Sequence, residues 1–204
     1  MAIEKITPKL LTEISNIKQI EPPEKSLINA ARNGAKDIIE VGMFEEKFVD
    51  IIPQKIKTLF TFGLRGCQVV SVIATAKNGN PVAILSHYPP MSLNVQCLGL
   101  EKILKQNQHI IDFNKKAEIS IALPEWSNCF DKTTEIDEQI LNKLQTTINE
   151  FFPNNQSRIL PYKTIGRKPD DSNAFIVSFP SNPDALIEYQ ALQTFGDFGK
   201  LIKT

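Results

Sequence analysis

The sequence predicts an α+β fold, in which a single domain has a mixed, mainly antiparallel, sandwich-like sheet flanked by helices. Three observations lead to this fold class: short apolar runs with strand-like alternation between residues 37 and 87, an Asn78-Gly79 hairpin signal between two of those runs, and amphipathic stretches of helical period in the second half. With 204 residues, 42% of them hydrophobic, the chain can bury one ordinary core. We expect one long helix on each side of the sheet.

The first elements are predicted from chain-breaking prolines and short apolar runs. Residues 1–36 are expected to form an arm or a helix docked on the core, because Pro22-Pro23 interrupts the pattern there. The core domain is expected over residues 37–204. Within these two parts the pattern predicts a helix over 25–32 and strands over 38–41, 48–52 and 57–62, the second strand being broken at Pro53.

A β-hairpin follows, and it brings two chemically interesting residues together. The run Gln68–Ala76 is β-branched and almost continuously apolar, which is typical of a strand covered on both faces. Asn78-Gly79 then predicts a tight turn, and Pro81–His87 predicts the returning strand. Cys67 stands at the start of one strand and His87 at the end of its neighbour, so the antiparallel pairing puts both at one end of the sheet.

The second half alternates helices and strands. Apolar residues at helical spacing predict a helix over 92–106, which buries Cys97, and a long helix over 134–152. Thr134 is the expected N-cap of the long helix, with Asp137 at its third position. The remaining predicted elements are strands near 117–123, 158–163 and 174–179, and a final helix over 182–192 that opens at Asn182-Pro183.

Composition and charge exclude several functional classes. The 23 Lys and Arg balance 23 Asp and Glu, so we expect no nucleic-acid partner. No apolar run reaches the roughly 20 residues of a membrane span, and the first residues have no hydrophobic signal core, so we expect a cytoplasmic protein without membrane insertion. The widely spaced Cys67, Cys97 and Cys129, with His87 and His109, predict no metal site. The oligomeric state is left open.

Cys67 and His87 have the residue types of a nucleophile and its base. Gly66 lets the backbone bend so that turn amides can face a carbonyl oxygen under attack, and His87 can take the thiol proton. Thr61 is a candidate to hold the imidazole ring. Each residue also has an ordinary alternative: a buried core cysteine, a strand-end histidine and a strand threonine. Arg65 is either part of the substrate-binding rim or an exposed loop arginine.

The stretch Thr61–Cys67, TFGLRGC, resembles a known motif. With Gly42-Met43 before it and Gly79–Pro90 after it (GNPVAILSHYPP), it resembles the N-terminal half of the chemoreceptor glutamine deamidase family CheD. In that family a G-M segment precedes T-L-G-L-G-S-C, and a later segment contains H-x-x-L-P. Ile165-Gly166-Arg167 also resembles the G-R of a late segment of the family. The resemblance covers roughly residues 37–179.

The resemblance implies a reaction and roles for three residues. Cys67 is implied as the nucleophile, His87 as the general base and Thr61 as the third member, with no cofactor. The chain departs from CheD at Arg65-Gly66, where the family has G-S. Toxins similar to the catalytic domain of cytotoxic necrotising factor share the Cys-His fold and have a glycine directly before the cysteine, as this chain does.

The sequence therefore leads to a functional hypothesis with two alternatives. The hypothesis is a protein-glutamine deamidase, a hydrolase that converts a Gln side chain of a target protein to Glu through a Cys67 thioester. Its partner would be a protein with an accessible glutamine, either in the cytoplasm or in a host cell into which the chain is delivered. The alternatives are a catalytically silent protein-binding module of the same fold, and a cysteine peptidase or transglutaminase that uses the same dyad.

Overall fold

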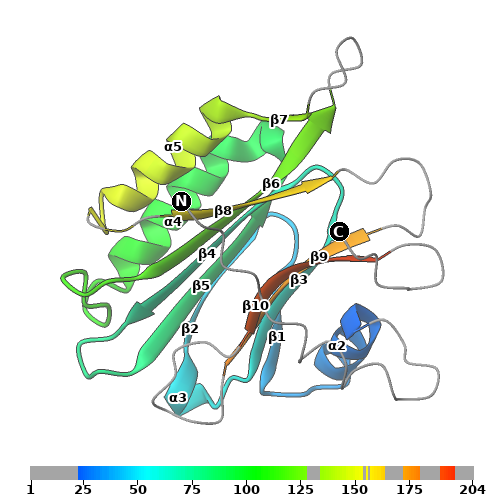
Figure 1. The fold of residues 1–204 in the computed structure, drawn as a ribbon. Helices are drawn as coiled ribbons and strands as arrows, with labels where there is room; N and C mark the ends of the chain where they lie inside the picture. Colours follow the sequence, from blue (N-terminus) through cyan, green and yellow to red (C-terminus); the bar gives the residue numbers. More distant parts are fainter. Residues whose placement is uncertain are drawn as a thin grey trace.

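Two β-sheets packed face to face form the centre of the fold, with helices on both outer faces (Figure 1). The computed structural model describes residues 23–127, 134–153, 155, 157–163, 172–179 and 189–195. These residues make an α+β fold with two mixed sheets flanked by helices in a single domain, as the sequence predicts. The layers run from a helix pair through a six-stranded sheet and a four-stranded sheet to a single helix.

The six-stranded sheet is built around the predicted hairpin. Its strands are β2 (Glu45–Asp50), β5 (Pro81–Tyr88), β4 (Gln68–Thr75), β6 (Glu118–Ser127) and β7 (Thr134–Ile136) in spatial order, with β8 (Ser157–Lys163) parallel to β6. The turn between β4 and β5 uses Gly79 at φ 92°, a conformation that only glycine adopts without strain. The β-branched residues of β4 and β5 are buried on both faces, except for the half-buried Thr75 at the end of β4, as the continuous apolar run predicts.

The four-stranded sheet joins segments from the two ends of the described chain. Its order is β1 (Ile38–Glu40), β3 (Thr58–Leu64), β9 (Ser172–Ser178) and β10 (Tyr189–Phe195). Only β1 and β3 run parallel in it, and β6 and β8 are the parallel pair of the larger sheet. Antiparallel pairing therefore predominates among the described strands of both sheets, as predicted.

The two long helices lie on the same side of the molecule. Helices α4 (Leu93–Gln106) and α5 (Glu138–Asn149) pack side by side on the outer face of the six-stranded sheet (Figure 1). The expectation of one long helix on each side is therefore wrong. The physical reason is that the second sheet occupies the inner face, so both amphipathic helices bury their apolar stripes on the outer face. The far side is covered by α2 (Pro23–Arg32).

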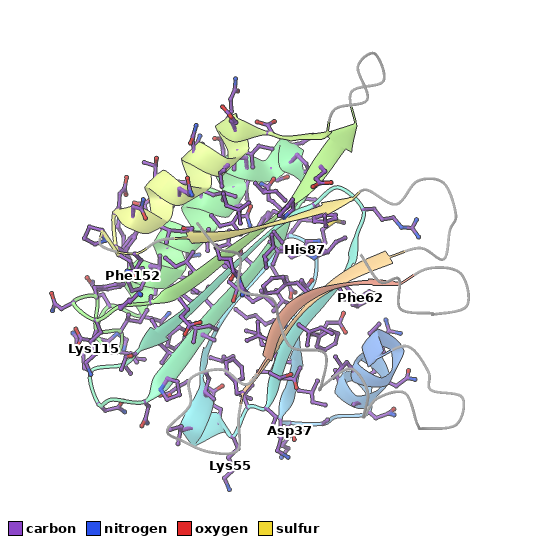
Figure 2. All side chains as sticks on the ribbon, viewed as in Figure 1. Asp37, Lys55, Phe62, His87, Lys115 and Phe152 are labelled. Carbon is purple, nitrogen blue, oxygen red and sulfur yellow. The ribbon has the colours of Figure 1, made fainter. Side chains whose placement is uncertain are left out.

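Alternation along the strands divides the core into layers. On β5, Val82 and Ile84 face the long helices, whereas Ala83 and Leu85 face the space between the sheets. On β3, Leu59 belongs to the same intersheet core, whereas Phe60 and Phe62, at alternate positions of the strand, pack towards α2 on the other side. Figure 2 shows His87 between the layers and Phe152 under the long helices. Inward positions of β3 and β5 thus meet between the sheets.

Three predicted elements differ in the structure. Thr134–Ile136 form strand β7, so Thr134 is not the N-cap, and Asp137 caps α5 instead by accepting from the N–H groups of Gln139 and Ile140. The predicted strand over 48–52 ends at Asp50, and a short helix α3 (Ile51–Gln54) includes Pro53. The end of the predicted final helix is strand β10, because residues from Tyr189 pair with β9. Residues 182–188 lie outside the described part.

Candidate active site

The three candidate residues come from two strands and the turn that joins β3 to β4. Thr61 lies on β3 at an inward position, and β5 carries His87 on the same face as Ala83 and Leu85. Cys67 directly precedes β4, and Val69, two residues further along the chain, pairs with His87. The period of two along each strand therefore directs His87 towards β3 and leaves Cys67 at the same end of the hairpin.

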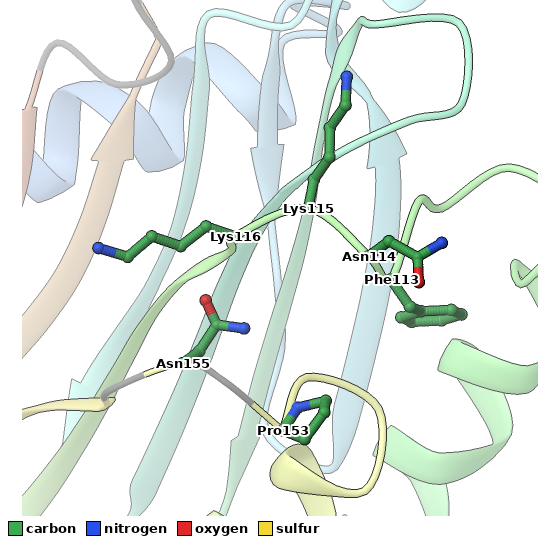
Figure 3. Close-up of a pocket in the computed structure, with 6 residues that line it drawn as sticks. All are labelled: Phe113, Asn114, Lys115, Lys116, Pro153 and Asn155. Carbon is green, nitrogen blue, oxygen red and sulfur yellow. The ribbon is translucent and has the colours of Figure 1, made fainter.

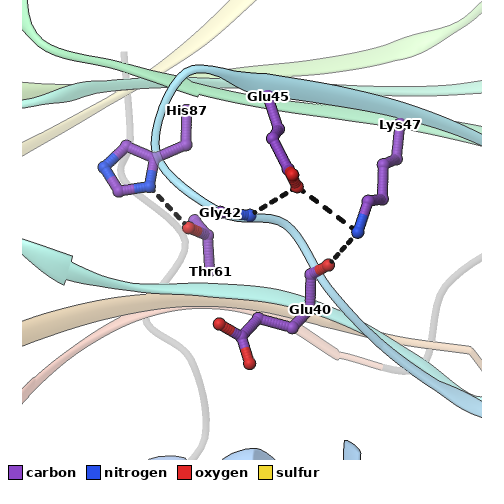
Figure 4. A network of polar contacts seen from close by, with 6 residues as sticks. All are labelled: Glu40, Gly42, Glu45, Lys47, Thr61 and His87. Atoms are coloured by element: carbon purple, nitrogen blue, oxygen red, sulfur yellow. Dashed lines mark hydrogen bonds and ion pairs between the residues drawn. The ribbon is translucent and has the colours of Figure 1, made fainter.

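Thr61 and His87 are joined by a buried hydrogen bond. The Thr61 Oγ1 atom lies 2.7 Å from His87 Nδ1 (Figure 4), and the two residues are 0% and 2% exposed. When Nδ1 carries the hydrogen, Thr61 accepts it and Nε2 presents a lone pair. His87 Nε2 is buried without a hydrogen-bond partner among the described residues. The ring is thus oriented at one nitrogen and uncommitted at the other.

Burial sets the protonation state of His87. Removal of the ring from water lowers its pKa from 6.5 to about 4, because an apolar surrounding disfavours the charged imidazolium. Thr61 is neutral and cannot offset this effect as a carboxylate would. At neutral pH, His87 is therefore neutral, which is the state in which an imidazole can accept a proton.

Cys67 is buried in the same intersheet core. Its residue is 8% exposed and packs in the cluster that contains Leu85 and Val69. Burial raises the pKa of the Cys67 thiol, and a backbone hydrogen bond from Arg65 partly offsets this by lowering the pKa. Because His87 Nε2 has no partner in the described chain, the thiol and the imidazole are not hydrogen-bonded to each other here. Both groups are neutral at pH 7.

A tyrosine from β8 holds the backbone on both sides of Cys67. The Tyr162 hydroxyl accepts a hydrogen bond from the Gly66 N–H at 3.2 Å and donates one to the Cys67 carbonyl. Tyr162 is 3% exposed. Sequence analysis missed this residue, since it lies 95 positions from Cys67. The available signal is weak: an aromatic residue with a polar tip on a strand, which needs a hydrogen-bond partner when buried.

The predicted substrate-binding residues lie on the same turn in different environments. Gly66 is buried at φ 138°, and Arg65 is exposed. Because the Gly66 N–H already donates to Tyr162, an oxyanion at this turn would rely on the other backbone amides around Cys67. The helix-side Cys97 is 7% exposed and part of the core, as predicted, and His109 is exposed. Cys129 and Gly166-Arg167 lie outside the described residues.

The segment that links β1 to β2 crosses from one sheet to the other beside His87. Its ends are fixed by backbone hydrogen bonds from Val41 to Phe60 and from Phe44 to the His87 carbonyl, both 2.8 Å. Glu45 accepts from the Gly42 N–H at 3.0 Å and pairs with Lys47 at 3.3 Å (Figure 4). The hydrogen bond from Gly42 lowers the pKa of Glu45. We call residues 41–44 the crossing segment.

A separate cavity lies at the opposite end of the larger sheet (Figure 3). It has a volume of about 240 Å³ and is lined by Phe113, Asn114, Lys115, Lys116, Pro153 and Asn155. Residues 113–116 precede β6, whose first residue, Glu118, pairs with Ile73 near the far end of β4, and Pro153 and Asn155 precede β8. The cavity is therefore on the order of 20 Å along the strand from Cys67. The parts of the chain that the structure describes contain no cluster of metal-ligating side chains and no helix long and apolar enough to span a membrane.

Comparisons with known proteins add a distant likeness in structure. No family model and no curated protein matches the chain. Among solved structures, the chain is similar to the crystal structure of the C-terminal domain of CNFy from Yersinia pseudotuberculosis, at 10% identity and a TM-score of 0.35. The match covers 80% of this chain and 58% of that one. A likeness of this size leaves the activity to be argued from the residues of the site.

Proposed function

We propose that this chain is a protein-glutamine deamidase with Cys67 as nucleophile, His87 as general base and Thr61 as the residue that orients the imidazole. The observation that carries the proposal is the buried 2.7 Å hydrogen bond between Thr61 and His87 Nδ1, together with a buried Nε2 beside the start of β4 that has no partner among the described residues. A structural histidine would be expected to satisfy both ring nitrogens in a core. One oriented and one uncommitted nitrogen is the arrangement of a base awaiting a proton.

The reaction follows from the two neutral groups. As a glutamine side chain enters, the Cys67 S–H proton passes to His87 Nε2 while the S–C bond forms, and the carbonyl oxygen becomes an oxyanion held by turn amides. The C–N bond then breaks, and ammonia leaves with the proton from His87. Water, deprotonated by the same nitrogen, hydrolyses the thioester, which gives glutamate and restores the Cys67 thiol. No oxidant or cofactor enters this balance.

An exposed apolar surface near the site favours a protein substrate over free glutamine. Met43 and Phe44 are each 53% exposed on the crossing segment, and Met91 is 98% exposed just after β5. Val95 and Leu98 are also exposed, on α4, which packs against β2 and β5. The Phe44 ring also contacts Tyr88, next to His87 in sequence. Exposed apolar side chains gathered beside a catalytic group are typical of a protein-docking surface.

The proposal is tested with two substrates that contain glutamine: a blocked dipeptide, carbobenzoxy-Gln-Gly, and unfolded casein. We expect the wild-type protein to release ammonia and to raise the mass of each product by about one dalton per event without chain cleavage. Cleaved casein would instead indicate a peptidase, and an adduct with an added amine would indicate a transglutaminase. Wild-type protein that releases no ammonia from either substrate contradicts the proposal.

Matched variants assign the roles. Cys67→Ser is expected to abolish ammonia release, whereas Cys97→Ser, which also changes a buried cysteine, is expected to retain it. Thr61→Val leaves His87 Nδ1 without its partner and should lower kcat on the order of 10²-fold. Thr147→Val removes a threonine hydroxyl bonded only within α5 and should change nothing. Equal effects of the two threonine variants would remove Thr61 from the mechanism.

One observation favours a second candidate, the catalytically silent binding module. Cys67 is 8% exposed, and the thiol does not donate to His87. A module that keeps the fold without catalysis would have this closed arrangement permanently. In that case Cys67→Ser would retain every partner and every phenotype, and the wild-type protein would release no ammonia in the assay above.

A further inference from the structure

Tyr162 contacts the backbone of the candidate nucleophile at two peptide groups. Its hydroxyl accepts from the Gly66 N–H, which belongs to the peptide before Gly66, and donates to the Cys67 carbonyl, which belongs to the peptide after Cys67. The peptide between them, whose N–H is that of Cys67, is the one that Tyr162 does not engage. One phenol therefore fixes the two peptides that flank the Cys67 amide.

Burial and backbone conformation make this contact specific. Tyr162 packs in the intersheet core with Cys67, and burial raises the pKa of its hydroxyl, so the donor to the Cys67 carbonyl stays protonated. Gly66 is at φ 138°, where a side chain would be strained. The turn is held in an uncommon conformation from β8, a strand distant in sequence. Such conformations persist where the surrounding structure fixes them.

We propose that Tyr162 is a positioning residue, which holds the turn so that the Cys67 N–H faces the oxyanion formed when Cys67 is acylated. The inference rests on the proposed function, because it needs an acyl-transfer reaction to serve. The Tyr162 hydroxyl forms these two hydrogen bonds with backbone groups rather than with the thiol or His87. Because Tyr162 fixes the orientation of the Cys67 N–H, its loss should slow the reactions of Cys67 that form an oxyanion. The rates of reactions without an oxyanion should not change.

Two reagents separate these reactions. In the attack on p-nitrophenyl acetate, the S–C bond forms, the ester C–O bond breaks after an oxyanion has formed, p-nitrophenolate leaves, and the thiol proton passes to His87. Iodoacetamide alkylates the same sulfur by displacement of iodide, with no oxyanion. A role in packing alone would change both rates together, whereas a role in amide direction changes only the first.

The experiment compares Tyr162→Phe with the wild-type protein, in a background with Cys97 and Cys129 replaced. We expect the acylation rate of Cys67 to fall on the order of 10²-fold, while the alkylation rate stays at the wild-type value. Tyr88→Phe is the matched control: it also removes a buried phenol hydroxyl, but that one is bonded to Glu46 on the helix side. It should retain both rates. Thermal melting monitors folding of each variant.

A second variant tests the same turn without touching the tyrosine. Gly66→Ala places a side chain at φ 138° and should also lower acylation more than alkylation. Wild-type acylation in Tyr162→Phe overturns the inference and leaves the proposed function intact. A wild-type protein that p-nitrophenyl acetate does not acylate at Cys67 overturns both, because no acyl transfer then remains for Tyr162 to assist.

Discussion

At the scale of single residues, the site is a neutral pair rather than a preformed ion pair. Burial raises the pKa of Cys67 and lowers that of His87 to about 4, so both changes oppose a thiolate and an imidazolium at pH 7. Thr61 orients the imidazole ring of His87 and carries no charge that would stabilise an imidazolium. If Cys67 acts as a nucleophile, proton transfer therefore has to accompany its attack on any electrophile, since no thiolate is formed beforehand.

The pKa of His87 predicts a specific loss of stability in acid. The folded-state value of about 4 lies below the ordinary 6.5, so the unfolded chain binds the proton first as the pH falls. Stability from neutral His87 is thus fully present above pH 6.5 and is lost as the pH falls to about 4, by about 3 kcal/mol. We expect urea titrations to show a smaller decrease in unfolding free energy between pH 7 and pH 4 for His87→Gln.

The control for this prediction is the second histidine. His109 is exposed, so His109→Gln should retain the full acid sensitivity of the wild-type protein. If His87→Gln and the wild-type protein lose the same free energy over this pH range, the buried imidazole is not held neutral by the fold.

The sequence predicts three residues of the candidate site, and it misses Tyr162 for a physical reason. Thr61, Cys67 and His87 lie within one β-hairpin and the strand before it, so local spacing is enough to bring them together. Tyr162 reaches the same turn through the parallel pairing of β8 with β6, a contact that joins residues 95 positions apart. No local pattern contains that information. It arises from sheet order alone.

At the scale of elements, periodicity identifies strands and helices well but their boundaries poorly. Ile136 continues the apolar stripe of α5 in sequence, yet it belongs to β7. The sequence does not reveal this strand, because three residues are too few to show alternation. Likewise, the residues from Tyr189 have no strong strand pattern, and pairing with β9 fixes their conformation. In both cases a neighbouring strand overrides a local preference.

The revised start of α5 gives a prediction about its N-cap. The Asp137 side chain accepts from two N–H groups at 3.0 and 3.1 Å, so Asp137→Ala should lower the unfolding free energy by about 1 kcal/mol. Gln139→Ala, at an exposed position in the first turn, should cost much less. Thermal denaturation measures both. A larger loss for Thr134→Ala than for Asp137→Ala would restore the helix start that the sequence predicts.

At the scale of the whole molecule, the four layers meet at three interfaces. The middle interface, between the two sheets, contains the candidate site. The sequence predicts the sandwich because β4 and β5 are apolar on both faces, and each face needs a cover. It does not say which cover lies on which face. That choice depends on where the described strands β9 and β10 join β3, and it places the second sheet, rather than a helix, over His87.

The shared intersheet core predicts that the two sheets unfold together. Leu59 is fully buried in β3 of the four-stranded sheet, and the single tryptophan, Trp126, lies on β6 of the other. Leu59→Ala should lower the unfolding free energy by about 2–5 kcal/mol. Tryptophan fluorescence and far-UV circular dichroism should report the same shifted midpoint. Two separate transitions would show that the sheets are independent units.

Cys67 and Cys97 belong to different layers, one between the sheets and the other under α4. The six-stranded sheet lies between their side chains, so the two sulfurs cannot approach to the bond length of a disulfide while the sheet is intact. Air oxidation therefore has no intramolecular route from Cys67 to Cys97. In a folded preparation kept without reductant, the intact sheet therefore prevents a disulfide between Cys67 and Cys97, the other described cysteine.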